Sequence, residues 1–451
     1  MCFSTSVKCF QIKRQLPELI RPASPTPHEI KLLSDIDDQN GLRYHESMVS
    51  FYKRRGDQDT SNRSKEEDPV KVIKAALAET LESYYPFAGR VIEAPKEKLA
   101  VDCTGEGVMF IEADADVTLE DFGDEVRPPF PGFDELLYDV PGSSEILHAP
   151  LLLVQVTRLR CGGFIFALRF NHAISDGAGI AQFQKAVAEI ARGASAPSVT
   201  PVWMRQLLNA RDPPGITSIH REYDATPYSN TKTQDPFASH KDLVERSFFF
   251  GPGKISAILT FLPANLRLMC SDFDVLTACL WRYRTRALQT SPEKEAKVMF
   301  AVNARSRFNP PLPKGYYGVA FATPVAVTTV EELIKNPLEY TVELVMKAKS
   351  EVTGEYMKSV ADLMVLKGRP AHVVESAFLV SDLRRLGFDQ VDFGWGEPVY
   401  AGIAELPTEL REQGRGERDQ CSSLLTKTCH GRGERDQCSS LLTKTCHGKV
   451  Y

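Results

Sequence analysis

Residues 151–192 constrain the fold more than any other part of the chain. The stretches LLLVQV and GFIFALRF are rich in large and β-branched apolar residues and are separated by Cys161, Gly162 and Gly163. This pattern predicts a hairpin, or two buried strands joined by a Gly-Gly turn. From Gly177 onward the apolar residues recur at three- and four-residue spacing. That spacing predicts a helix of about three turns with one apolar face.

The connection between the second strand and the helix carries the run NHAISDGAGI at 171–180. His172 is expected at the strand end, Asp176 at the helix N-cap and Gly193 at the C-terminal cap. A histidine in this position could act as a general base, or it could be an ordinary hydrogen-bonded histidine. Asp176 could likewise be an N-cap alone. Ser175 is not expected to be a nucleophile, because adjacent residues cannot easily supply a Ser-His-Asp geometry and no GxSxG elbow occurs.

Two separated motifs resemble those of the plant BAHD acyltransferases. HAISDG at 172–177 matches the family's HxxxDG motif, and DFGWG at 392–396 matches its second signature, in the correct order. Supporting stretches include SPTPHEIKLLSDIDD, YYPFAGR, FDVLTACLWRYRT and VNARSR. The resemblance runs from about residue 10 to about residue 404. Within the family, the chain is most similar to fruit alcohol acyltransferases and benzyl alcohol O-benzoyltransferases.

The resemblance implies an α/β fold with two chloramphenicol-acetyltransferase-like domains. Each would be a mixed sheet with flanking helices, and the active-site channel would lie between them. We expect an N-terminal domain at 1–192, a crossover linker at 193–244 and a C-terminal domain at 245–404. The linker is rich in Ser, Thr, Asn and Pro and weakly periodic. The chain length suits two domains of about 200 residues each.

The resemblance also implies the reaction, which is transfer of an acyl group from acyl-CoA to a small aliphatic or benzylic alcohol to form an ester. Neutral imidazole can accept a proton near physiological pH, so His172 is expected to be the general base. Acyl-CoA is expected as a co-substrate, with no bound cofactor. Asp176 is expected to pair with Arg305 and to hold the backbone that aims His172. A transferase acting on amines would use the same base and remains an alternative.

The DFGWG motif is expected to form a framework turn near the CoA channel. Gly394 and Gly396 permit backbone conformations that a Cβ would resist, and Asp392 could bond neighbouring amides or an arginine. Trp395 could donate its indole N–H to the oxyanion or could be a packed structural residue. These four residues are therefore expected to be structural residues at the active site.

The acceptor pocket is harder to locate from the sequence. By resemblance, SMVSFYK at 47–53 lines this pocket, with Met48 and Ser50 facing inward. A pocket with Met, Val and Phe nearby favours an apolar acceptor such as an aliphatic or benzylic alcohol. The competing interpretation is that they are ordinary core residues of a strand. In GYYGVAF, Val319 stands where the family commonly has an asparagine, which removes a polar group from near the channel.

Composition excludes several other classes of function. The net charge of −5 and the absence of a basic block argue against a nucleic-acid partner. Apolar runs are too short for a membrane span, and the N-terminus lacks the apolar segment of a signal peptide. The ten cysteines are dispersed or lie in the tail, which favours a reducing cytoplasm. We expect a cytoplasmic monomer.

The tail at 405–451 departs from the family pattern. GRGERDQCSSLLTKTCH at 414–430 recurs unchanged at 431–447. The cysteine spacing does not match structural zinc sites, so no metal is expected. With two leucines per copy as the only large apolar residues, the tail is expected to be disordered. The alternative to an active enzyme is therefore a catalytically impaired remnant that lacks the family's C-terminal strands.

Overall fold

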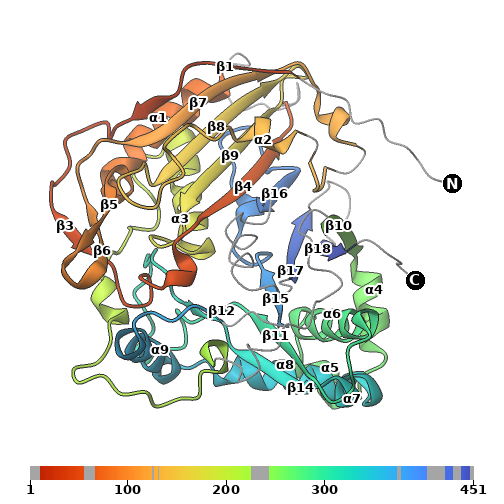
Figure 1. The fold of residues 1–451 in the computed structure, drawn as a ribbon. Coiled ribbons are helices and arrows are strands. Elements are labelled where there is room, and N and C mark those ends of the chain that lie inside the picture. Colours follow the sequence, from red (N-terminus) through yellow and green to blue (C-terminus); the bar gives the residue numbers. More distant parts are fainter. Residues whose placement is uncertain are drawn as a thin grey trace.

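The chain folds into two α/β halves, each built around a mixed sheet (Figure 1). The computed structural model describes residues 11–54, 67–123, 126–130, 132–224, 243–372, 377–403, 422–429 and 438–446. The expected architecture of two mixed α/β domains is confirmed. No helix in these ranges is long and apolar enough to cross a membrane.

The first domain contains a seven-stranded sheet in the order β1-β7-β8-β9-β4-β16, with β2 paired to β7 off this path. Its strands are β1 (Ile12–Arg14), β2 (Glu18–Ile20), β4 (His45–Tyr52), β7 (Val108–Ala115), β8 (Leu152–Leu159), β9 (Phe164–Asn171) and β16 (Tyr400–Ile403). The β7–β8 pair is parallel and the other pairs are antiparallel. A smaller sheet, β3-β6-β5, adds β3 (Ile30–Leu32), β5 (Arg90–Ala94) and β6 (Lys98–Asp102).

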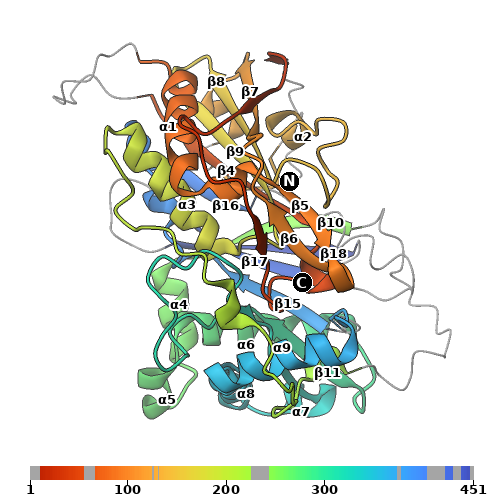
Figure 2. The same ribbon diagram turned by 90° about the vertical axis from the view of Figure 1, so that its left-hand side faces the viewer.

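Helices α1 (Pro69–Ser83) and α3 (Gly177–Ala191) lie side by side against the first sheet (Figure 2). Their buried apolar side chains join those of β8 and β9 in one core cluster. The predicted hairpin is confirmed, because β8 and β9 pair antiparallel on either side of the Gly-Gly turn. The predicted helix follows at once, and Gly193 just beyond its end has a positive φ of 93°, which favours glycine.

The second domain contains a six-stranded sheet in the order β10-β18-β17-β15-β11-β14. Its strands are β10 (Leu243–Phe250), β11 (Glu295–Phe300), β14 (Val325–Thr329), β15 (Ala377–Asp382), β17 (Ser422–Cys429) and β18 (Cys438–Cys446). The helices of this half are α4 (Pro252–Leu259), α5 (Ala264–Met269), α6 (Asp272–Leu288), α7 (Val330–Lys335), α8 (Leu338–Glu351) and α9 (Gly354–Lys367). A two-stranded sheet, β12 (Val302–Asn303) with β13 (Phe321–Ala322), faces the first domain.

The domain boundaries differ from those expected. Strand β16 falls in the range 245–404 assigned to the second domain, yet it pairs with β4 of the first, with Ile403 opposite Met48. In Figure 1 its blue ribbon lies beside the red β4. The chain therefore returns to the first sheet after building most of the second. The expected linker ends at 244, whereas β10 already begins at Leu243; residues 225–242 lie outside the described residues.

The tail also differs from the expectation of disorder. Each copy of the repeat contributes one strand, β17 or β18, to the second sheet. Strand β17 runs parallel to β15, and β18 pairs antiparallel with both β17 and β10. Backbone pairing, and not burial of apolar side chains, accounts for these two strands. Strands β15 and β10 would otherwise present unpaired backbone groups on facing edges, and pairing with the repeat satisfies them.

Candidate active site

His172 follows directly after β9 and lies where the two domains meet. Its backbone N–H donates to the Tyr44 carbonyl over 2.8 Å, which ties the end of β9 to the start of β4. The imidazole ring lies 5.0 Å from the Tyr44 ring and 5.6 Å from the Phe170 ring, both in the first domain. The Phe321 ring of the second domain lies 5.9 Å away. The histidine is thus enclosed by aromatic rings from both domains.

The environment of His172 keeps its imidazole neutral. The residue is only 8% exposed. This burial lowers its pKa below the ordinary 6.5, outweighing the opposing effects of the Asp176 charge and of the histidine's own backbone. Nδ1 is buried and has no hydrogen-bond partner among the described residues apart from the histidine's own backbone. A neutral imidazole has one unprotonated ring nitrogen, which can accept a proton.

Asp176 caps α3 and also pairs with Arg305, so both roles considered for it are present together. Its Oδ1 accepts the N–H of Gly179 over 2.9 Å at the helix N-terminus. Arg305 approaches the carboxylate with both terminal nitrogens, each over 2.8 Å. The N–H of Ala320 donates to Oδ2 over 3.0 Å. With four donors around it, this carboxylate holds the helix, the loop and the second domain together.

The charge state of Asp176 follows from these contacts. Burial on its own would raise the pKa of this carboxyl, but the charge and hydrogen bonds of Arg305, with the amides of Gly179 and Ala320, hold the pKa below its ordinary 3.8. A carboxylate so fully engaged has no free position from which to take a proton from His172. The geometry therefore favours a positioning role.

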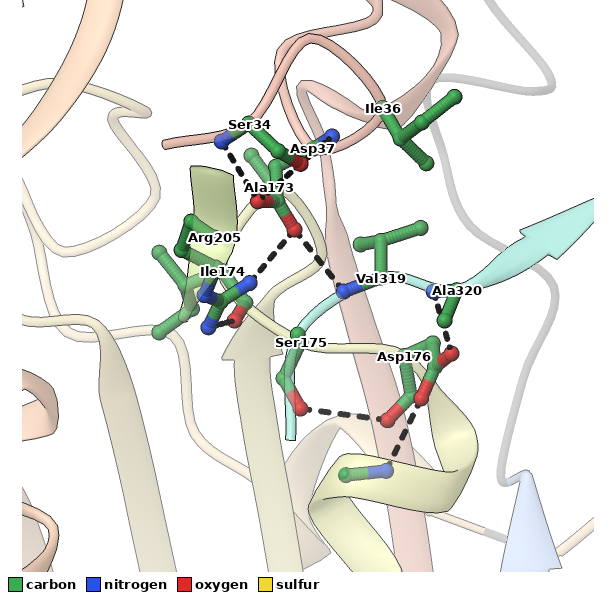
Figure 3. A network of polar contacts seen from close by, with 12 residues as sticks. Ser34, Ile36, Asp37, Ala173, Ile174, Ser175, Asp176, Arg205, Val319 and Ala320 are labelled. Atoms are coloured by element: carbon green, nitrogen blue, oxygen red, sulfur yellow. Dashed lines mark hydrogen bonds and ion pairs between the residues drawn. The ribbon is translucent and has the colours of Figure 1, made fainter. Parts of the chain in front are cut away.

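A second buried ion pair lies on the other side of the same loop (Figure 3). Arg205 donates from Nη1 to Oδ1 of Asp37 over 2.6 Å and from Nη2 to the Ile174 carbonyl over 2.8 Å. The arginine comes from the short 3-10 helix Arg205–Leu208 in the crossover. The residue is 1% exposed, and Asp37 is completely buried. Sequence reasoning did not single out this pair.

One segment of the second domain, residues 316–320, touches both aspartates. The N–H of Val319 donates to Oδ1 of Asp37 over 2.9 Å, and the next N–H, that of Ala320, donates to Asp176. Figure 3 shows these successive amides bridging the two carboxylates. Ser175 Oγ donates to the Tyr317 carbonyl over 2.8 Å. This hydroxyl is fully buried and is engaged in the framework, which disfavours its use as a nucleophile.

The DFGWG motif forms a turn at the opposite end of β9 from His172. The Asp392 carboxylate accepts the N–H groups of Gly394 and Gly396 over 2.7 and 2.8 Å. Both glycines have positive φ, at 109° and 89°. The ring of Trp395 packs edge-on against Phe164 at 5.4 Å.

The strand register gives the separation between this turn and the histidine. Asn171, next to His172, is opposite His45, whereas Phe164 is opposite Tyr52 at the other end of the β4–β9 pair. Seven residues of strand span about 23 Å. The motif does not adjoin His172, and the Trp395 indole is not placed to donate to an oxyanion there.

Comparison with known proteins identifies the family. The family model described as the Transferase family matches residues 10–410. The chain belongs to this family of BAHD acyltransferases. Benzyl alcohol O-benzoyltransferases of Petunia hybrida and Nicotiana tabacum are 61% and 62% identical to it over 396 residues, covering 88% of this chain and 84% of each relative. Alcohol acyltransferase 16 of Actinidia chinensis var. chinensis is 53% identical over 397 residues, with the same shares covered.

Solved structures show the same fold. Vinorine synthase aligns with a TM-score of 0.69 at 23% identity, covering 96% of this chain and 94% of that one. TRI101 of F. sporotrichioides, solved with coenzyme A and T-2, aligns with a TM-score of 0.63 at 15% identity, covering 92% and 94%. At these identities the likeness concerns the fold alone.

The remaining candidate residues of this transferase are packed in the structure. Met48 is 4% exposed and belongs to the core cluster of the first domain, and Ser50, two residues along the same strand, is equally buried. The Val319 side chain is fully buried in the core of the second domain. Its departure from the family pattern therefore places an apolar side chain in an apolar core, while its amide still serves Asp37.

The missed pair left little signal in the sequence. Asp37 lies within SPTPHEIKLLSDIDD, one of the stretches that resemble the family, but three other aspartates or serines stand beside it. Arg205 lies in a crossover of weak periodicity, about 168 positions away in sequence. The one local hint is Trp203, over whose ring the Arg205 guanidinium lies at 4.3 Å.

Proposed function

We propose that this transferase moves an acyl group from acyl-CoA to a small aliphatic or benzylic alcohol and forms an ester, with His172 as the general base. The observation that carries the proposal is the histidine itself. Its neutral ring lies at the meeting of the two domains with Nδ1 buried, and we assign Nε2 to the substrate. The names of the relatives at 61% and 62% identity supply the substrate class.

The reaction follows from these residue types. Nε2 of His172 accepts the hydroxyl proton as the alcohol oxygen attacks the thioester carbonyl. The C–O bond forms, and the carbonyl oxygen takes the negative charge of a tetrahedral intermediate. The intermediate collapses, the C–S bond breaks, and the proton held by His172 passes to the departing CoA sulfur. The products are the ester and free CoA, and no covalent acyl-enzyme is needed.

Asp176 and Arg305 set the position of His172 in this proposal. Asp176 begins the helix four residues after the histidine, and Arg305 fixes that carboxylate to the second domain. Positioning of this kind matters because small displacements of a catalytic group cost large factors in rate.

The aromatic rings around His172 support an apolar acceptor. Tyr44 and Phe321 are partly exposed while their rings face the imidazole. A benzylic or aliphatic alcohol would bury apolar surface against them, whereas a polyol would have to give up the hydration of several hydroxyl groups. Met48 and Ser50 on β4 remain our proposal for further lining of this pocket.

The alternative of an impaired remnant concerns the tail. The repeat strands β17 and β18 fill the second sheet between β15 and β10, which supports an intact wall on that side. Replacing residues 405–451 with a family-type C-terminus distinguishes an active enzyme from an impaired remnant. Activity that is unchanged by the replacement supports the active enzyme, and activity that is present only after it supports the remnant.

The deciding experiment measures free CoA thiol and the ester product together. Purified protein receives benzoyl-CoA or acetyl-CoA with benzyl alcohol, hexanol, benzylamine or glycerol. With benzyl alcohol and with hexanol we expect thiol and ester to form in equal amounts. With glycerol we expect little of either product. Amide formation faster than ester formation would favour the amine alternative. Folded protein that releases no thiol with any acceptor would contradict the proposal.

A further inference from the structure

The loop that carries His172 is held from two sides, and only one of these supports, the Asp176–Arg305 pair, involves the HxxxDG motif. We infer that Asp37 and Arg205 form a second positioning pair for His172, acting through the Ile174 carbonyl and the 316–320 segment. This inference rests on the proposed role of His172 as the base.

Arg205 connects three parts of the molecule with one guanidinium. It reaches Asp37 in the first domain over 2.6 Å and the carbonyl of Ile174, two residues beyond the histidine, over 2.8 Å. The arginine itself belongs to the crossover between the domains. A Cβ on Gly318 would lie 1.9 Å from its Nη1, so the second domain approaches the guanidinium closely as well.

Asp37, like Arg205, makes several hydrogen bonds that fix its position. Its Oδ2 accepts the backbone N–H and the hydroxyl of Ser34 over 2.8 and 2.6 Å, and its Oδ1 accepts the Val319 N–H (Figure 3). The next amide, that of Ala320, donates to Asp176. The 316–320 segment therefore contacts the carboxylates of both ion pairs. The loop from His172 to Asp176 lies between them and has a fixed contact on each side.

The burial of this pair is a reason to assign it a positional role. The side chains of Arg205 and Asp37 are 2% and 0% exposed. Desolvation of two charges costs about as much as their attraction returns, so buried pairs contribute little net stability compared with apolar residues of similar volume. Such a pair does fix the positions of the groups that hydrogen-bond to it, because hydrogen bonds are directional and apolar contacts are not. Here those groups include the carbonyl of the catalytic loop.

The chain offers a matched control on the same crossover. Arg211 pairs with the fully buried carboxylate of Asp362 on α9, with 2.6 Å between Nε and Oδ2. Its other partners are Gly215, Thr217 and Glu355. None of these belongs to the loop that carries His172. Loss of the Arg211 pair therefore loosens the crossover without touching the loop directly.

The test compares two double variants, Asp37→Asn with Arg205→Met and Asp362→Asn with Arg211→Met. Each removes both charges of a pair, so neither leaves an uncompensated buried charge. The first readout is the pKa of His172, followed by NMR of the ¹³C-labelled imidazole and assigned with His172→Ala. The second is the separate measurement of kcat and of KM for benzoyl-CoA. Both variants retain Asp176 and Arg305, the other ion pair at this loop.

In the Asp37 and Arg205 variant we expect the His172 pKa to rise toward 6.5, because a loosened loop admits water to a ring whose pKa is lowered by burial. We expect kcat to fall by about 10- to 100-fold with KM changed by no more than about threefold. The Asp362 and Arg211 variant should leave the His172 pKa and kcat unchanged. Should the first variant not fold, Arg205→Lys keeps the charge, cannot reach both acceptors, and should show the same changes to a smaller degree.

Two results would overturn the inference. One is a folded Asp37 and Arg205 variant whose His172 pKa and kcat match those of the wild type. The other is an equal change in the Asp362 and Arg211 variant, which would indicate general loosening of the crossover. The titration does not depend on turnover. Wild-type protein without alcohol-dependent thiol release would therefore contradict the proposed function while the NMR result still decides the positioning inference.

Discussion

Changing Asp176 to asparagine separates a positioning carboxylate from a chemical one. The side chain keeps its size, and its amide oxygen can still accept the Gly179 N–H at the helix cap. It loses the charge that faces Arg305, whose side chain is 19% exposed. It also presents an NH₂ group to donors that had faced a carboxylate oxygen.

The structure sets the size of this effect. Removing one member of a buried pair costs about 3–5 kcal/mol, because the remaining charge is left uncompensated. For domains of this size the cost corresponds to a fall in Tm of about 10 °C. The folded pKa of Asp176 lies below its ordinary 3.8. The stability it contributes is therefore present above that pH and is lost only as the pH falls through the folded pKa. Between about pH 5 and 8 the Tm difference should be constant.

The assay is thermal unfolding combined with thiol release per folded molecule, for Asp176→Asn, Arg305→Met and the double variant. Because the double variant leaves neither charge unpaired, its destabilisation should be smaller than the sum of the two single effects by at least about 1 kcal/mol. An Asp176→Asn protein with the wild-type Tm and no activity would refute this reasoning and restore a direct chemical role for the carboxylate.

Three further outcomes follow from the same geometry. Because burial lowers the His172 pKa, kcat/KM should fall on acidification with a midpoint below 6.5; a pH profile checks this, and a midpoint at or above 6.5 contradicts it. Gly318→Ala should destabilise the protein by about 1–3 kcal/mol, since the added Cβ meets the Arg205 guanidinium; an unchanged denaturation midpoint would show that the segment can yield. Trp395→Leu should lower Tm through lost packing on Phe164 while kcat stays within about threefold; a normal Tm with abolished turnover would place the indole in the chemistry.

The local pattern of the sequence predicted the elements that present His172. The change from strand-like to helical spacing after the hairpin gave β8, β9 and α3, and the cap position of Asp176 followed from residue type. Its partner Arg305 came from the family resemblance, because no local pattern links positions 129 residues apart.

Contacts between segments that are distant in the sequence were not predicted, for a physical reason. The return of β16 to the first sheet, the place of the repeat strands in the second, and the Asp37–Arg205 pair each depend on contacts between distant segments. Backbone hydrogen bonds and buried charges determine which distant segments pair in the folded structure. The local periodicity of a sequence does not contain this information. The distance of DFGWG from His172 was hidden for the same reason, because it depends on the register of β4 against β9.

The most direct test of the central claim compares wild-type protein with His172→Ala and Ser175→Ala in alcohol-dependent release of CoA from benzoyl-CoA. We predict that His172→Ala remains folded but loses at least about 100-fold in kcat, while Ser175→Ala keeps most of its activity. Full activity in folded His172→Ala would contradict the account.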